Sequence, residues 1–198
     1  RRFGRSLGIN TIPAKTCTYA CVYCQVGRTT ESTLVPRAFR PADEVVALVT
    51  ERGRALRAEG EGVDVLTFVP DGEPTLDVHL GVSIRAVRAP DLRVAVLTNA
   101  SLLWREDVRD ALLAADWVSL KIVTVDERTW RQLNRPVRRL DLAVVLAGVR
   151  RFAEEFHGHL ATETVLMKFV EQFDQLGLLH MLLIQRLHGC ETRRRARL

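Results

Sequence analysis

The chain has 198 residues, of which 47% are apolar and 27% are charged, and its formal net charge is +5 with a pI near 9.4. This length and composition suit one folded domain and exclude a disordered or low-complexity chain. No uncharged apolar run reaches the roughly 18 residues of a transmembrane helix, so we expect a cytoplasmic protein with no membrane contact and with reduced thiols. The net positive charge permits a nucleic-acid substrate, although a solvated basic tail around Arg193 to Arg197 also accounts for part of this charge.

Five apolar segments rich in branched side chains are predicted to form strands, over residues 7–12, 63–69, 92–97, 117–123 and 160–167. Helical spacing of apolar residues, with proline, acidic residues or glycine at the ends, predicts helices over residues 41–60, 78–87, 105–115, 126–134, 140–156 and 168–187. Because strands and helices alternate, the fold class is α/β with a parallel sheet. Periodicity alone leaves open whether the sheet is a curved partial barrel or is open and doubly wound. In both arrangements reactive groups collect at the C-terminal ends of the strands.

Three of the four cysteines, Cys17, Cys21 and Cys24, fall within eight positions. This spacing lets one short loop direct three thiolates at a single inorganic centre. A cube of four irons held by three thiolates keeps one iron without a protein ligand, where a small molecule can bind. Two other interpretations compete. A structural zinc site needs a fourth ligand, which distant Cys190 does not readily supply, and a disulfide or plain buried thiols would not need such density.

The cysteine spacing, with Tyr23 just before the last cysteine, resembles the signature of the radical S-adenosylmethionine (radical SAM) superfamily. The resemblance implies a radical SAM core over residues 1–167, built as a partial (βα) barrel of about five to six units, with a C-terminal helix and basic tail over residues 168–198. Cys17, Cys21 and Cys24 would bind a 4Fe-4S cluster, with Tyr23 against the cluster or the adenine. The cofactors would be this cluster and S-adenosylmethionine. An electron donor such as flavodoxin or ferredoxin would reduce the cluster, and cleavage of S-adenosylmethionine would give a 5'-deoxyadenosyl radical.

The turn Asp71 to Pro74 follows the second predicted strand. Gly72 permits close backbone approach, and such a turn can hold carbonyls toward an ammonium group, although turns of this composition are common. The turn resembles the superfamily's GGEP motif, with Asp71 in place of the first glycine, which implies that Gly72 and Glu73 contact the methionine end of S-adenosylmethionine. Thr98 and Asn99 close the third strand. By the same resemblance they lie near the ribose or carboxylate of the cofactor, whereas their plain interpretation is chain capping.

On the fourth predicted strand, Ser119 and Lys121 share one face, while the apolar side chains between them share the other. The apolar face should meet the helices, so the serine and lysine are predicted to face the inside of the curve. Lys121 would then need a ligand carboxylate or a partner such as Glu163, or would extend to the barrel mouth without a role. By similarity to the superfamily, Ser119 would hydrogen-bond the ribose.

Four stretches narrow the resemblance to the branch that includes wyosine-type tRNA-modifying synthases and uncharacterised relatives: residues 8–10, 119–122, 126–130 and 134–136. That branch makes tRNA a candidate substrate, but its further cysteines for a second cluster are missing from this sequence. The substrate therefore stays open among a tRNA base, a peptide and a small metabolite. The alternative functions are a catalytically inactive iron-sulfur-binding module and a zinc-binding interaction domain.

Overall fold

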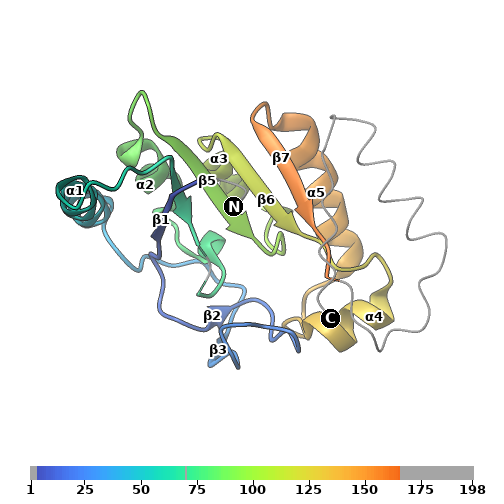
Figure 1. The fold of residues 1–198 in the computed structure, drawn as a ribbon. Helices are drawn as coiled ribbons and strands as arrows, with labels where there is room; N and C mark the ends of the chain where they lie inside the picture. The colour runs from blue at the N-terminus through green and yellow to red at the C-terminus, as the bar shows by residue number, and fades with distance from the viewer. Residues whose placement is uncertain (1–3, 70, 166–198) are drawn as a thin grey trace.

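In the computed structural model, which describes residues 4–69 and 71–165, five parallel strands form the central sheet (Figure 1). Their order across the sheet is β1 (Ser6–Ile9), β4 (Val65–Phe68), β5 (Arg93–Thr98), β6 (Trp117–Lys121) and β7 (His159–Glu163). Every pairing between neighbours is parallel. The predicted α/β class with a parallel sheet is confirmed.

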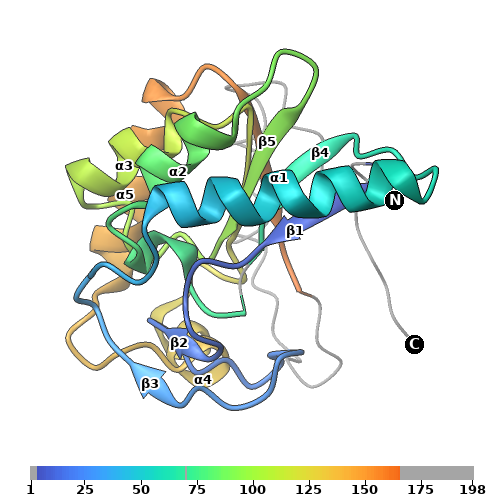
Figure 2. The same ribbon diagram turned by 90° about the vertical axis from the view of Figure 1, so that its left-hand side faces the viewer.

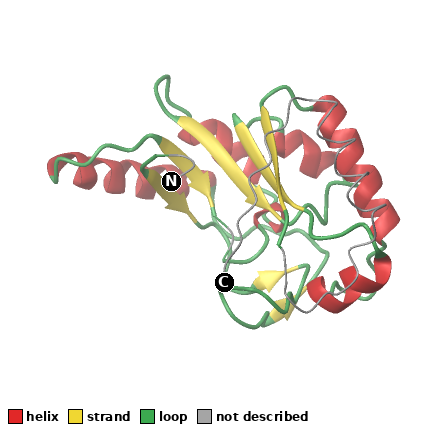
Figure 3. Ribbon diagram, turned by 45° about the vertical axis from the view of Figure 1, so that its right-hand side comes forward, coloured by secondary structure: helices red, strands yellow, loops and turns green. Residues whose placement is uncertain are grey.

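The described helices are α1 (Ala42–Ala58), α2 (Leu80–Val87), α3 (Glu106–Leu112), α4 (Glu127–Asn134) and α5 (Leu142–Glu155). Figures 2 and 3 show α1, α2, α3 and α5 around the outside of the sheet. The five strands follow one another in chain order across the sheet, without the reversal that defines a doubly wound fold. Strand order therefore decides between the two arrangements that periodicity left open, in favour of the partial barrel.

One hydrophobic core joins the sheet to the outer helices. Strand β4 is buried at all four positions, as expected for a strand covered on both faces. Side chains that are at most 2% exposed come from the central strands and from the helices that cover them, and include Leu66, Phe68, Val94, Val96, Val118, Leu120, Leu80, Ile84, Leu112 and Phe152. This core fixes the strand ends from which the functional loops depart.

Helix α5 packs closely on the connection that follows β5. A Cβ at Gly148 would lie 2.3 Å from the backbone nitrogen of Trp104, so this crossing requires glycine. The Arg109 side chain, 3% exposed, bonds Glu155 at 2.8 Å and the carbonyl oxygen of Leu103 at 3.0 Å. These contacts hold α3, α5 and the connection together.

The structure also departs from the predicted elements. The helix expected over residues 78–87 begins at Leu80 and is preceded by a 3-10 turn, Pro74–Leu76. The short pair β2 (Thr16–Cys17) and β3 (Glu31–Ser32) was not predicted, because strands of two residues have no periodicity. The helix expected over 168–187 and the division at residue 167 lie outside the described residues. Within the described part of the chain, no helix has the length and apolar character that crossing a membrane requires.

Candidate functional site

The three predicted ligand cysteines lie on one loop beyond the C-terminal ends of the sheet strands. The loop starts at β2, which contains Cys17, and its far end returns as β3, which pairs with β2 in parallel. Figure 1 shows β2, β3 and α4 together at this edge of the sheet. Cys17, Cys21 and Cys24 are all free and partly buried. The cysteine loop therefore lies at the C-terminal ends of the strands, where the sequence predicted the reactive groups.

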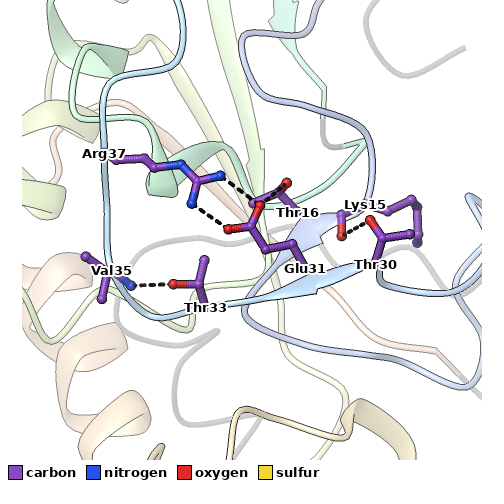
Figure 4. A network of polar contacts seen from close by, with 7 residues as sticks. All are labelled: Lys15, Thr16, Thr30, Glu31, Thr33, Val35 and Arg37. Carbon is purple, nitrogen blue, oxygen red and sulfur yellow. Dashed lines mark hydrogen bonds and ion pairs between the residues drawn. The ribbon is translucent and has the colours of Figure 1, made fainter.

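Polar contacts around Glu31 close the base of this loop (Figure 4). The Glu31 carboxylate accepts hydrogen bonds from the Arg37 guanidinium at 2.5 and 2.7 Å and from the Thr16 hydroxyl at 3.3 Å. The Lys15 carbonyl accepts the backbone N–H of Thr30 at 3.1 Å. The exposed ion pair adds little stability by itself. Its geometric effect is to hold the two ends of the loop side by side.

Helix α4 holds the middle of the cysteine loop through the backbone. The Val22 N–H donates to the Leu133 carbonyl at 2.9 Å, and the Ala20 N–H donates to the Asn134 carbonyl at 3.0 Å. These carbonyls are among the last in the helix, where intrahelical partners are missing. Arg135 then adopts a left-handed φ of 45° and turns the chain along the loop. The last carbonyl groups of α4 are thus hydrogen-bonded by the loop that this helix supports.

The other end of α4 is also anchored. The Asp126 side chain caps the helix by accepting the Thr129 N–H at 2.7 Å. The Trp130 indole N–H donates to the Tyr19 hydroxyl at 3.3 Å, and the two rings meet edge to face at 5.8 Å between centroids. Both aromatic residues are only 3% exposed. Tyr19 belongs to the cysteine loop, so this contact fixes the loop against the body of the helix.

Each of the three cysteine sulfurs receives one side-chain nitrogen donor, and each donor comes from a different part of the chain. A sulfur that accepts hydrogen bonds in this way suits a thiolate, the form in which cysteine binds metal. Hydrogen bonds to the sulfurs are a usual feature of iron-sulfur sites. The three contacts run from Asn99 Nδ2 to Cys17 Sγ at 3.5 Å, from Asn134 Nδ2 to Cys21 Sγ at 3.5 Å and from Lys15 Nζ to Cys24 Sγ at 3.2 Å.

Burial controls the ionisation of two of these thiols. Burial, followed by the nearby Glu73 carboxylate, raises the pKa of Cys17 to about 12. Burial also raises the pKa of Cys21, against the lowering effect of hydrogen bonds from Tyr23 and Asn134. Without a bound cation these thiols keep their protons at neutral pH. A metal centre at the site would supply the positive charge that releases them.

The number of clustered cysteines distinguishes between kinds of metal centre. Across residues 4–69 and 71–165, no three His, Cys, Asp or Glu side chains converge on a position that could hold one metal ion. A structural zinc site requires four such ligands around one ion. In a four-iron cluster each cysteine binds a different iron, so the sulfurs are spread around a cube. Three thiolates on one loop are the number that a four-iron cluster with one open iron needs, and one fewer than a structural zinc site needs.

The turn that follows β4 presses against the start of the cysteine loop. The Lys15 N–H donates to the Asp71 carbonyl at 2.6 Å, and the Glu73 N–H donates to the Thr16 carbonyl at 3.0 Å. A Cβ on Gly72 would lie 2.0 Å from that same Thr16 oxygen, so only glycine fits between the two segments. The close approach that the sequence predicted for Gly72 is made to the cysteine loop.

Asp71, which departs from the superfamily's double glycine, has a structural use. Its carboxylate accepts a hydrogen bond from Asn10 Nδ2 at 2.8 Å, just beyond the end of β1. Its carbonyl accepts the Lys15 N–H, as described above. Asp71 therefore joins the turn to both ends of the segment that connects β1 to the cysteine loop.

Glu73 is 1% exposed and accepts four hydrogen bonds. The Thr75 N–H and hydroxyl donate at 3.1 and 2.6 Å, the Thr98 hydroxyl donates at 2.6 Å and the Asn99 N–H donates at 2.8 Å. Burial nevertheless raises the pKa of Glu73, although these donors oppose it. The structure thus brings together Glu73, Thr98 and Asn99, three of the predicted site residues, with the Thr98 hydroxyl already occupied by the glutamate.

A further set of hydrogen bonds continues from Asn99 into the cysteine loop. The Asn99 amide nitrogen donates to the Thr18 hydroxyl at 2.8 Å, and the Thr18 hydroxyl shares a hydrogen bond of 2.7 Å with the Ser101 hydroxyl. Thr18 and Ser101 have no solvent exposure. Because Asn99 also contacts Cys17, hydrogen bonds run without a break from Glu73 to the first cysteine.

The remaining predicted residues lie on the same side of the loop. The Tyr23 hydroxyl accepts a hydrogen bond from Asn134 Nδ2 at 2.6 Å, and the Lys121 ammonium lies 5.4 Å from the centroid of the Tyr23 ring. Lys121 pairs in register with Glu163 of β7. The Ser119 hydroxyl is buried and, within the described residues, has no hydrogen-bond partner. Tyr23 and Lys121 are thus brought to the cysteines, while Ser119 lies two positions earlier on β6.

Sequence reasoning missed three residues of this site: Lys15, Thr18 and Asn134. Asn134 belongs to a stretch that narrowed the resemblance, but no role followed from it. The contact of Lys15 with Cys24 depends on a left-handed φ of 69° at Lys15, which no local pattern in the sequence predicts. Thr18 lies between two cysteines, and a polar side chain in that position was the one available signal.

Comparison with known proteins identifies the family of this chain. Residues 11–176 match the family model for the radical SAM superfamily. A UPF0026 protein of Methanocaldococcus jannaschii is 45% identical over 175 residues, which are 88% of this chain and 54% of that protein. A UPF0026 protein of Synechocystis sp. is 34% identical over 183 residues, which are 91% of this chain and 67% of that protein. The chain thus spans about half to two thirds of the length of these curated relatives.

Two solved structures share the fold at low sequence identity. SuiB of Streptococcus suis, solved with S-adenosylmethionine, has a TM-score of 0.63 and 16% identity, covering 94% of this chain and 39% of SuiB. TYW1, a wyosine synthase solved with a lysine-pyruvate adduct, has a TM-score of 0.53 and 13% identity, covering 83% of this chain and 56% of TYW1. The family match includes the three-cysteine loop, the turn beside it and strands β4 to β7. By that match the chain belongs to the radical SAM superfamily of enzymes.

Proposed function

We propose that the chain is the core of an enzyme in which Cys17, Cys21 and Cys24 bind one 4Fe-4S cluster and S-adenosylmethionine binds at its open iron. The observation that carries this proposal is the set of three nitrogen donors, one facing each sulfur. When bound, the cluster supplies an electron that splits S-adenosylmethionine into methionine and a 5'-deoxyadenosyl radical, which takes a hydrogen atom from the substrate. The chain's own residues hold, orient and shield these groups.

Glu73 and Gly72 are proposed to receive the methionine end of the cofactor. The Glu73 carboxylate is buried, and within the described residues it forms no ion pair with a cation. An ammonium group nearby would provide the missing positive charge and favour the ionised carboxylate. Thr98 and Asn99 hold this carboxylate in place, so we assign them a positioning role beside any direct contact.

Tyr23, Ser119 and Lys121 are proposed to bind the rest of the cofactor. The buried Ser119 hydroxyl lacks a partner within the described residues, which suits a hydroxyl of the ribose. Lys121 offers a cation to a carboxylate, and its place near the Tyr23 ring puts both groups beside the cysteines. Burial raises the pKa of Tyr23, so this side chain stays neutral.

The proposal extends to the partners of the reaction. A low-potential carrier such as flavodoxin or ferredoxin is expected to reduce the cluster. Among substrates, tRNA is the candidate that follows from the resemblance to wyosine-type synthases, and the fold shared with TYW1 supports testing it first. The alternative function, a catalytically inactive iron-sulfur-binding module, is suggested by Asp71 in place of the first motif glycine.

Anaerobic reconstitution with iron and sulfide tests the proposal. We expect about four irons and four sulfides per chain, a paramagnetic spectrum of the reduced cluster that changes when S-adenosylmethionine is added, and release of 5'-deoxyadenosine. Cys21→Ala should lose all three results, whereas Cys190→Ala, which removes the remaining cysteine, should keep them.

The outcomes separate the competing functions. A cluster that responds to S-adenosylmethionine without releasing 5'-deoxyadenosine would favour the inactive module. Zinc without iron or sulfide after anaerobic purification would favour the structural zinc site. Retention of the cluster by Cys21→Ala would refute the proposed ligand set.

A further inference from the structure

Lys15 is a buried cation in contact with one of the three cysteines. Its side chain is 9% exposed, and its ammonium nitrogen lies 3.2 Å from Cys24 Sγ. Within residues 4–69 and 71–165 no carboxylate forms an ion pair with it. Burying an ammonium group is unfavourable unless a negative charge accompanies it. Its hydrogen-bond acceptor, the Cys24 sulfur, can carry that charge as a thiolate.

The backbone holds Lys15 in an unusual conformation. Its φ is 69°, in the left-handed region that side chains other than glycine seldom adopt. Its N–H donates to the Asp71 carbonyl at 2.6 Å, and its carbonyl accepts the N–H groups of Thr30 and Glu31 at 3.1 and 3.3 Å. The same carbonyl accepts the Thr30 hydroxyl at 3.5 Å (Figure 4). Strained residues of this kind persist where the surrounding structure imposes them. The base of the cysteine loop therefore fixes the point from which the lysine side chain departs.

Lys15 also differs from the other two donors in charge. Asn99 and Asn134 present neutral amides to Cys17 and Cys21, whereas Lys15 presents an ammonium group to Cys24. Hydrogen bonds to charged partners are shorter and stronger than those between neutral groups, and low solvent exposure strengthens them further. Of the three sulfurs, Cys24 therefore receives the strongest electrostatic stabilisation from these donors.

We propose that Lys15 is the counter-ion of the Cys24 thiolate and makes the bound cluster easier to reduce. This inference rests on the proposed function, because it takes Cys24 as a cluster ligand. Reduction adds one electron, whose negative charge spreads over the irons and their sulfurs. A cation beside one ligating sulfur stabilises the reduced cluster more than the oxidised one. Lys15 is thus a positioning and electrostatic residue that acts through Cys24.

The test is a redox titration of the reconstituted chain, followed by paramagnetic resonance. For Lys15→Gln we expect the ratio of reduced to oxidised cluster at a fixed solution potential to fall about tenfold, which is about 59 mV toward lower potential for a one-electron couple. Lys15→Arg keeps the charge and should retain most of the wild-type ratio. Arg28→Gln is the matched control, since it removes one positive charge from an exposed position of the same loop and should leave the ratio within about a factor of two.

Each outcome bears on one of the two proposals. A wild-type chain that binds no cluster overturns the proposed function and this inference together. A cluster that responds to S-adenosylmethionine but keeps its potential in Lys15→Gln overturns the inference alone, as does an equal shift in Arg28→Gln. If Lys15→Gln fails to assemble a cluster while Lys15→Arg succeeds, the need for the charge is supported. Failure of both variants would overturn the charge argument.

Discussion

The substitution Gly72→Ala tests how closely the turn after β4 presses on the cysteine loop. The added Cβ would lie 2.0 Å from the Thr16 carbonyl oxygen and 2.9 Å from Ile12 Cδ1. The isoleucine side chain can move, but the Thr16 oxygen is part of the backbone and accepts the Glu73 N–H at 3.0 Å. The turn must therefore retreat by about 1 Å, which breaks that hydrogen bond.

The cost follows from two contributions. Forcing an extra carbon into a packed site costs about 2 kcal/mol, and losing one backbone hydrogen bond costs about 1 kcal/mol. The reduced freedom of the unfolded chain returns about 0.5 kcal/mol. We therefore expect the free energy of unfolding to fall by about 2.5 kcal/mol, which lowers the Tm of a domain of this size by about 8 °C.

Thermal and urea unfolding of the metal-free chain measure this loss, with Gly53→Ala as the control. Gly53 lies inside α1, and the nearest atom to a Cβ there is Arg57 Nη1 at 4.0 Å. The same substitution should raise stability at that position by about 0.5 to 1 kcal/mol, because alanine favours a helix. If Gly72→Ala unfolds at the wild-type temperature or above it, the close contact between the turn and the cysteine loop is wrong. Anaerobic reconstitution of the same variant should also give less cluster, since the start of the loop is displaced.

Four other substitutions probe the fold and the supports of the site. Burial raises the pKa of Glu73 in the folded state above its unfolded-state value of about 4.3, so the carboxyl contributes most stability below about pH 4.3 and this contribution is lost as the pH rises through the folded-state pKa. Urea unfolding at about pH 8 and pH 5 should therefore show the wild type gaining stability relative to Glu73→Gln at the lower pH. A difference that stays constant would contradict this sign. Asp126→Ala should cost about 1 kcal/mol of stability at pH 7, because it removes the cap of α4. The hydrogen bond to Thr129 lowers the pKa of Asp126, so thermal melts should show the difference between wild type and variant shrinking only below about pH 4. A loss that persists at pH 2 would exclude the cap as its cause. Arg109→Met should cost about 2 kcal/mol in urea unfolding by leaving the Leu103 carbonyl unpaired, and Glu155→Gln should cost less, because that carboxylate is partly exposed.

Much of the fold follows from local patterns in the sequence. The apolar, branched residues over 63–69 predict a strand covered on both faces, and β4 is indeed buried at all four positions. Proline and acidic residues mark the start of α1, and apolar spacing marks α5. Strand order could not be predicted, because parallel strands wound into a barrel and those of a doubly wound sheet have the same local signals.

The site was predictable where chemistry depends on residue type and not where it depends on unusual backbone geometry. Three cysteines at short spacing predict a metal centre, and a glycine after a buried strand predicts a close approach of another segment to the backbone. The role of Lys15 depends on a positive φ, which for a lysine has no sequence signature. Thr98 was expected to lie near the ribose or carboxylate of the cofactor, which stays a prediction; its hydroxyl also donates to Glu73, a contact that the sequence did not predict.

The cysteine loop is supported on three sides, and each support controls a different cysteine. The turn after β4 fixes the Lys15 backbone, and Lys15 contacts Cys24. The end of β5 supplies Asn99 to Cys17, and the end of α4 supplies Asn134 to Cys21. Because each of these elements begins or ends on the same sheet edge, the relative positions of the three sulfurs depend on strand register and not on the loop alone. The ends of β4, β5 and α4 therefore position the three sulfurs together with the loop.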